Sequence, residues 1–153
     1  MVDNLFTQYL NKTMLKAIIF DMDGLLIDSE PLWQEAEIEI FSQINILLTR
    51  ELCLETTGLR VDEVVEYWYR RTPGVKFTKK EVEESIINRV NELICLKGKP
   101  KQGVSYILNF FQAKNVKLAL ATSSSYAIIN VVLEKLGLLN VFQEICSATE
   151  EEY

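Results

Sequence analysis

Histidine is absent from the 153 residues of this chain. A Ser-His-Asp or Cys-His catalytic set, a histidine-bound zinc ion and an imidazole base are therefore excluded within it. Any proton transfer falls to carboxylates, lysine, tyrosine or cysteine. Cysteine is scarce and odd in number, at Cys53, Cys95 and Cys146, with no CxxC pair. The sequence thus favours neither a disulfide framework nor a thiolate metal site.

Positive charge and long apolar runs are also in short supply. The net charge of −6 argues against nucleic acid and anionic membrane surfaces as partners, because both bind clustered Lys and Arg. No stretch of about 18 uncharged residues is present to cross a membrane. Residues 1–13 form an expected leader that lacks the apolar core of a secretory signal. Free, widely spaced thiols then favour a cytoplasmic location.

Three short apolar runs predict the strands of an α/β fold. Residues 17–20 and 118–121 are continuously apolar and end in polar turn residues, which is typical of strands buried on both faces of a parallel sheet. Residues 144–147 are a weaker third candidate. Apolar residues at helical spacing lie on either side of the second run, and Gly137 follows the later helix as a C-terminal cap. This alternation predicts part of a Rossmann-like, doubly wound sheet.

A long helical stretch separates the first two predicted strands. Residues 30–100 hold three amphipathic patterns, and Thr78 with Glu81 forms a capping-box signature before the last of them. An ordinary crossover between parallel strands needs far fewer residues. We therefore expect an inserted α-helical cap at 30–100 and a core built from 14–29 and 101–153. Hinges are expected at 28–31 and 98–103.

Polar side chains follow the first two predicted strands. Asp21 and Asp23 end the first, at the carboxyl edge where open α/β sheets bind ligands. A plain turn is the alternative for these residues, because Asp and Gly commonly end strands. Thr122 and Ser123 end the second strand, where helix capping and anion binding are compatible roles.

The string FDMDGLLIDSEPLW at residues 20–33 resembles the first motif of the haloacid dehalogenase superfamily, in its branch of sugar-phosphate phosphatases and β-phosphoglucomutase. Residues 57–62 (TGLRVD) and 64–69 (VVEYWY) are most similar to its hexitol phosphatase and 2-deoxyglucose-6-phosphatase subgroup. The resemblance extends over residues 14–153. It implies a Rossmann-like core with a helical cap, and a phosphatase that uses Mg²⁺.

The resemblance also implies the roles of individual residues. Asp21 would be the nucleophile that attacks phosphorus, and Asp23 the general acid and base. Mg²⁺ would be held by the Asp21 carboxylate and the backbone carbonyl of Asp23. The phosphate-binding residues would be Asp21, Asp23, Gly24, Thr122 and Ser123. Arg60 could reach the substrate from the cap, since a guanidinium suits a phosphate or a polyol.

Trp33 and the aromatic residues at 67–69 could form a wall that stacks against a sugar. Trp68 lies on the apolar face of its predicted helix, so a place in the cap core is favoured for it.

The expected partner is a small phosphorylated sugar or polyol. A sugar-phosphate mutase is an alternative, because mutases share the first motif.

The family's later lysine and acidic pair have no match, since Lys135 lies within a helical pattern. We therefore expect a C-terminally truncated chain, impaired or inactive by itself. A catalytically inactive fragment that acts as a binding or assembly module is the second alternative. Truncation would leave residues 17–20 as an exposed sheet edge through which the chain self-associates.

Overall fold

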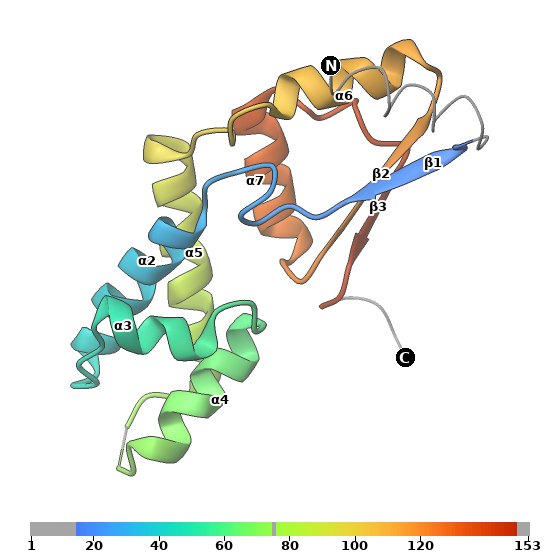
Figure 1. The fold of residues 1–153 in the computed structure, drawn as a ribbon. Coiled ribbons are helices and arrows are strands. Elements are labelled where there is room, and N and C mark those ends of the chain that lie inside the picture. The colour runs from blue at the N-terminus through green and yellow to red at the C-terminus, as the bar shows by residue number, and fades with distance from the viewer. Residues whose placement is uncertain (1–14, 75, 150–153) are drawn as a thin grey trace.

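The computed structural model describes residues 15–74 and 76–149; the expected leader at 1–13 lies outside them. Three parallel strands form one sheet in the order β1-β2-β3, and helices precede and follow β2 (Figure 1). The strands are β1 (Ala17–Phe20), β2 (Lys117–Thr122) and β3 (Glu144–Ser147). The helices are α2 (Glu30–Gln43), α3 (Arg50–Cys53), the 3₁₀ turn η1 (Leu54–Thr56), α4 (Val61–Arg71), α5 (Lys79–Lys97), α6 (Val104–Ala113) and α7 (Tyr126–Leu136). The predicted α/β fold is confirmed.

Burial alternates along the strands, so one face of the sheet is covered. Leu118 and Leu120 of β2 are buried, whereas Ala121 between Leu120 and the strand end is exposed. On β1, Phe20 packs edge-to-face against Phe111 of α6 and Phe142 before β3. This alternation is the period of two that a half-covered strand shows.

The prediction that residues 17–20 are buried on both faces is wrong for the described structure. Ile19 is 70% exposed and Ala17 is exposed, although both are apolar. A parallel sheet is buried on both faces only where helices cover both. Among residues 15–74 and 76–149, no element covers the face that Ile19 presents. β1 also has only β2 as a neighbour there, so its expected position as an edge strand is confirmed.

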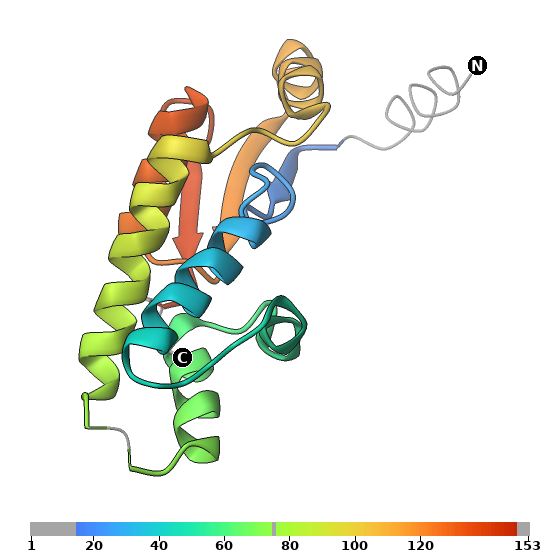
Figure 2. The same cartoon turned by 90° about the vertical axis from the view of Figure 1, so that its left-hand side faces the viewer.

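Helices α2 to α5 form a unit beside the sheet, with α2 and α4 packed on the long α5 (Figures 1 and 2). The Thr78 hydroxyl accepts from the Glu81 amide at 3.3 Å, and the Glu81 carboxylate accepts from the Thr78 amide at 2.9 Å. This confirms the predicted capping box. Trp68 of α4 is 5% exposed, as expected for a residue of the helical core.

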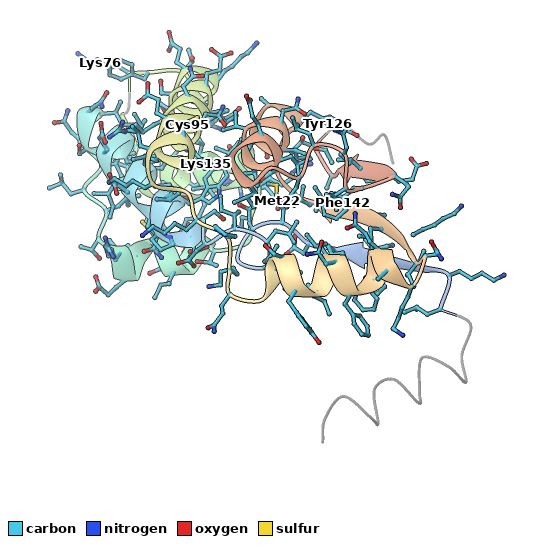
Figure 3. All side chains as sticks on the ribbon, turned by 90° about the horizontal axis from the view of Figure 1, so that it is seen from above. Met22, Lys76, Cys95, Tyr126, Lys135 and Phe142 are labelled. Carbon is cyan, nitrogen blue, oxygen red and sulfur yellow. The ribbon has the colours of Figure 1, made fainter. Side chains whose placement is uncertain are left out.

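Helix α5 also contacts α7, which belongs to the sheet layer. Lys135 of α7 lies beside Cys95 of α5, and its ammonium donates to the Cys95 carbonyl (Figure 3). Gly137, at a φ of 69°, ends α7 in the left-handed conformation that glycine adopts freely. Within the described part of the chain, no helix combines the length and apolar character that a membrane crossing requires.

The two segments that join the helical unit to the sheet lie side by side. The Asp28 amide donates to the Lys99 carbonyl at 3.0 Å, and the Lys101 amide donates to the Leu26 carbonyl at 3.0 Å. Lys101 Nζ also lies 2.9 Å from Asp28 Oδ1. Since both chain crossings run through this paired strip, it fixes the position of α2 relative to β1.

Candidate active site

A tight turn follows β1 and carries the two predicted catalytic carboxylates. Met22 is fully buried, and its carbonyl accepts from the amides of Leu26 and Ile27 at 2.9 and 3.2 Å. Gly24 has a φ of 74°, which favours glycine, and its amide donates to the Ile27 carbonyl at 2.9 Å. The Gly24 amide is therefore engaged within the turn.

Asp23 accepts hydrogen bonds from three elements. Its Oδ1 accepts from the Ser29 hydroxyl at 2.6 Å and from the Trp33 indole Nε1 at 3.2 Å. Its Oδ2 accepts from the Ser124 hydroxyl at 2.8 Å and from the Thr122 hydroxyl at 3.4 Å. These donors come from the β1 turn, α2 and the end of β2. They orient a half-buried carboxyl group at the junction between sheet and helical unit.

Asp21 has a different environment. Its side chain is exposed, and its Oδ1 accepts from the amide of the next residue, Met22, at 2.7 Å. Both Asp21 and Asp23 line the same cavity. The exposed carboxylate of Asp21 is thus open to a ligand, whereas that of Asp23 is held by protein donors.

The polar segment after β2 faces these carboxylates. Thr122 is buried, and its hydroxyl accepts from the Ser124 amide at 3.2 Å as well as donating to Asp23. Ser123 is exposed and lines the cavity. Ser125 precedes α7, and its buried hydroxyl has no partner among the described residues. The start of a helix presents free amides to an anion, so this segment suits a phosphoryl group.

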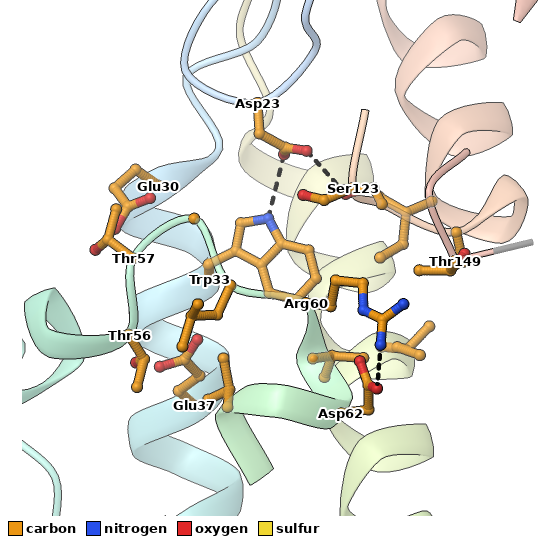
Figure 4. Close-up of a pocket in the computed structure, with 18 of the residues that line it drawn as sticks. Asp23, Glu30, Trp33, Glu37, Thr56, Thr57, Arg60, Asp62, Ser123 and Thr149 are labelled. Carbon is orange, nitrogen blue, oxygen red and sulfur yellow. Dashed lines mark hydrogen bonds and ion pairs between the residues drawn. The ribbon is translucent and has the colours of Figure 1, made fainter. Parts of the chain in front are cut away.

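A cavity of about 530 Å³ is lined by residues of both the sheet layer and the helical unit. Asp23 and Ser123 lie at one end of it, and Glu37 and Thr56 lie at the other, with Trp33 between them (Figure 4). The structure therefore brings the predicted Asp21, Asp23, Ser123 and Arg60 to one cavity. Thr122 is joined to it through Asp23, and Gly24 and Lys135 do not line it.

Arg60 is the residue immediately before α4, and it lines the cavity. Its Nη2 lies 2.8 Å from Asp62 Oδ2 (Figure 4), and its Nε lies 3.9 Å from Glu63 Oε2. These carboxylates hold the guanidinium against the wall of the cavity. Of the predicted aromatic wall, Trp33 lines the cavity, whereas Tyr67, Trp68 and Tyr69 do not.

Glu37 is a buried acid on the α2 side of the cavity. Burial raises the pKa of its carboxyl to about 7, and the negative charge of Glu30 acts in the same direction, against a hydrogen bond with Cys53. Burial also raises the pKa of the Cys53 thiol to about 12, with Glu37 adding to the effect. At neutral pH the Cys53 thiol therefore keeps its proton, whereas the Glu37 carboxyl is near the midpoint of its titration.

This shift predicts a dependence of stability on pH. An acid with a raised folded pKa binds more protons when folded, so the free energy of unfolding falls as pH rises from about 4.5 to above 7. Glu37→Gln removes the titration of this side chain. The free energy of unfolding of the variant minus that of wild type should therefore be about 2 kcal/mol larger at pH 8 than at pH 5. Urea unfolding at both pH values measures the difference. An unchanged pH dependence in the variant would contradict it.

The cavity is rich in carboxylates. Asp21, Asp23, Glu30, Glu37, Asp62 and Glu83 line it, with Arg60 as the cation among the described lining residues. A phosphate dianion would be repelled by such a lining unless a metal ion added positive charge. The Asp21 carboxylate and the Asp23 carbonyl are oxygen donors of the kind that Mg²⁺ prefers. Among the described residues, no three acidic or thiol side chains lie close enough together to hold a metal ion by themselves. The donor set thus suits Mg²⁺ that keeps several water ligands.

The sequence did not indicate that Ser29, Trp33 and Ser124 donate hydrogen bonds to Asp23. It also did not indicate that Glu37 lines the cavity. Ser29 and Trp33 fall within the string at 20–33, and Ser124 falls within the serine run after β2. A signal for Glu37 was its place one helical turn after Trp33, which puts both on one face of α2. Its burial depends on α3 and could not be predicted from that spacing.

Known proteins are similar to this chain over most of its length. A family model described as haloacid dehalogenase-like hydrolase matches residues 18–153. Hexitol phosphatase B from Escherichia coli is 36% identical over 138 residues, which is 90% of this chain and 62% of that protein. The β-phosphoglucomutase of Bacillus subtilis is 28% identical over 141 residues, covering 88% of this chain and 62% of that protein.

Solved structures share the fold. The crystal structure of a β-phosphoglucomutase from Clostridium difficile superimposes with a TM-score of 0.77 at 23% identity, covering 92% of this chain and 65% of that one. The chain thus spans a little under two thirds of the length of these relatives.

Proposed function

This chain belongs to the haloacid dehalogenase-like hydrolase family, and from that premise we propose that it hydrolyses the phosphate ester of a small sugar or polyol. The proposed reaction depends on Mg²⁺ and passes through an aspartyl phosphate on Asp21. The observation that carries the proposal is the single cavity that holds Asp21 and Asp23 opposite the polar segment before α7. The similarity to hexitol phosphatase B supports the class of substrate.

The chemistry follows from the two environments. An oxygen of the exposed Asp21 carboxylate forms a bond to phosphorus while the bond from phosphorus to the ester oxygen breaks. Asp23 gives a proton to the departing oxygen. In the second step Asp23 takes a proton from water as the water oxygen attacks phosphorus, which releases inorganic phosphate and free Asp21. The hydrogen bonds from Ser29, Trp33 and Ser124 keep the Asp23 carboxyl in place for both transfers.

Other residues hold the substrate in this proposal. Ser123 and the unpartnered Ser125 hydroxyl lie where phosphoryl oxygens would meet the start of α7. The Asp21 carboxylate and the Asp23 carbonyl would hold Mg²⁺, whose charge offsets the repulsion between carboxylates and phosphate. Gly24 and Thr122 shape the turn and the strand end behind this set. Arg60 would contact the substrate from the side of the helical unit.

Hydrolysis of p-nitrophenyl phosphate by the full chain tests the proposal. We expect slow hydrolysis that requires Mg²⁺, half-activated at roughly millimolar concentration because so few protein ligands are available. Chelation with EDTA is the control. Release of inorganic phosphate from a hexitol phosphate would distinguish a phosphatase from a mutase, which returns the phosphoryl group to a sugar hydroxyl. A rate equal to the EDTA control at all magnesium concentrations would overturn the proposal for this chain.

We also infer a role in assembly, because β1 is an edge strand whose uncovered face is apolar. Ile19 is 70% exposed, and the described residues place no strand on the free side of β1. Unpaired backbone groups beside exposed apolar side chains favour pairing with another chain. A second copy of this chain offers the same edge, so we expect self-association through β1.

Light scattering over a concentration series checks this expectation. The mean mass should rise with concentration for the wild type, and Ile19→Lys should lower the association because a charge would be buried at the interface. Leu47→Lys is the matched control, since Leu47 is 80% exposed in the helical unit, away from the sheet. A monodisperse wild-type monomer at high concentration would contradict the assembly role.

A further inference from the structure

Glu37 is the most buried acid that lines the cavity. Its residue exposure is 7%, and its Oε2 has no hydrogen-bond partner among the described residues. Other acids of the cavity differ in this respect. Asp62 pairs with Arg60, and Glu30 Oε1 accepts from the Thr57 hydroxyl at 3.0 Å. Glu37 thus lines the cavity on the far side of Trp33 from Asp23 and has an unused acceptor (Figure 4).

An unpaired buried oxygen is costly to keep. A polar group that loses water without gaining a partner destabilises a fold by about 1–3 kcal/mol. Aliphatic residues would fill the same place on α2 without that cost, as Ile40 does in the next turn of the same helix. The presence of the unpaired Glu37 Oε2 is explained if a bound ligand donates the missing hydrogen bond to it.

We propose that Glu37 hydrogen-bonds a hydroxyl group at the end of the substrate opposite the phosphoryl group, and so selects monophosphates whose far end is an uncharged polyol. This inference rests on the proposed phosphatase function, and it assigns the residue that contacts the part of the substrate away from the phosphoryl group. Asp21 and Asp23 hold one end of the cavity, and the Trp33 indole lies between them and Glu37 (Figure 4).

The charges around Glu37 support a neutral far end. Glu30, Asp62 and Glu83 line the same cavity, so a second phosphate or a carboxylate there would meet negative charge. A hydroxyl both donates and accepts, and a buried carboxyl that holds its proton does the same. The raised pKa of Glu37, near 7, agrees with this pairing. Glu30 and the Cys53 thiol are the titratable groups that act on it.

The test compares ligands that differ only at the far end. Calorimetry in Mg²⁺ measures binding of a hexitol 6-phosphonate, whose C–P bond resists hydrolysis, of the matching aldonate phosphonate with a terminal carboxylate, and of inorganic phosphate. Wild type should bind the hexitol compound at least about tenfold more tightly than the aldonate. In Glu37→Met the ratio of hexitol to phosphate affinity should fall about tenfold, and in Glu37→Gln it should change less than about threefold.

Glu39→Gln is the matched control, because Glu39 lies on α2 but is exposed and pairs with Arg89 outside the cavity. It should keep the wild-type ratio. Urea unfolding checks that Glu37→Met folds, and removal of a buried acid should leave it at least as stable as wild type. An unchanged ratio in Glu37→Met overturns the role of Glu37 and leaves the phosphatase proposal standing. Wild type that binds neither phosphate nor the hexitol compound overturns both.

Discussion

Asp21→Asn is expected to reduce turnover on the order of 10⁴-fold and to abolish the covalent phospho-enzyme, because an amide is too weak a nucleophile to attack phosphorus. The exposed position of Asp21 in the cavity makes the effect chemical, since the substitution disturbs no buried contact of the side chain. Rates with p-nitrophenyl phosphate and mass spectrometry of the acid-quenched protein measure the two effects.

Two further variants separate this role from its neighbours. Asp23→Asn keeps one oxygen, which can replace the acceptor of Ser29 or that of Ser124 but not both, and it cannot transfer a proton, so ester cleavage and phospho-enzyme hydrolysis should both slow. Asp28→Asn is the control from the same turn, where Asp28 is exposed and pairs with Lys101. It should keep the wild-type rate. A normal rate for Asp21→Asn would remove the nucleophile assignment altogether.

Gly98→Ala is expected to destabilise the chain by about 2–3 kcal/mol. Gly98 is buried at the end of α5, and a methyl group built on it would lie 2.5 Å from the Ile94 carbonyl oxygen and 3.2 Å from Ile27 Cδ1. The first contact is with backbone, which has no rotamer to relieve the clash. The paired strip, in which the Asp28 amide donates to the Lys99 carbonyl, must shift instead, and the position of α2 relative to β1 must shift with it.

Urea unfolding measures the loss of stability, with Lys99→Ala as the neighbouring control. Lys99 is exposed and contributes its backbone carbonyl to the paired strip, so truncation of its side chain should change the free energy of unfolding by less than about 0.5 kcal/mol. If Gly98→Ala also weakens binding of inorganic phosphate, the paired strip positions the site. Equal stability of Gly98→Ala and wild type would mean that the end of α5 moves freely.

Local patterns decided most of the elements. The apolar run at 17–20 coincides with β1 and that at 118–121 lies within β2, because short apolar segments bounded by turn residues favour buried strands; the weaker candidate at 144–147 coincides with β3. The capping box of Thr78 and the glycine cap at Gly137 coincide with helix ends for the same local reason. The short helix α3 was missed, since four residues carry too little periodicity to detect.

The sequence by itself predicted the residues of the proposed chemistry: Asp21 and Asp23 after β1, and Thr122 and Ser123 after β2. Only the tertiary structure decided what surrounds them. Ser29, Trp33 and Ser124 meet on Asp23 from separate elements. The burial that raises the pKa of Glu37 requires α3 to pack on α2, and the exposure of Ile19 requires knowing which face of β1 is covered. Strand and helix propensities act within a few residues, whereas burial and charge environment are sums over segments far apart in the chain.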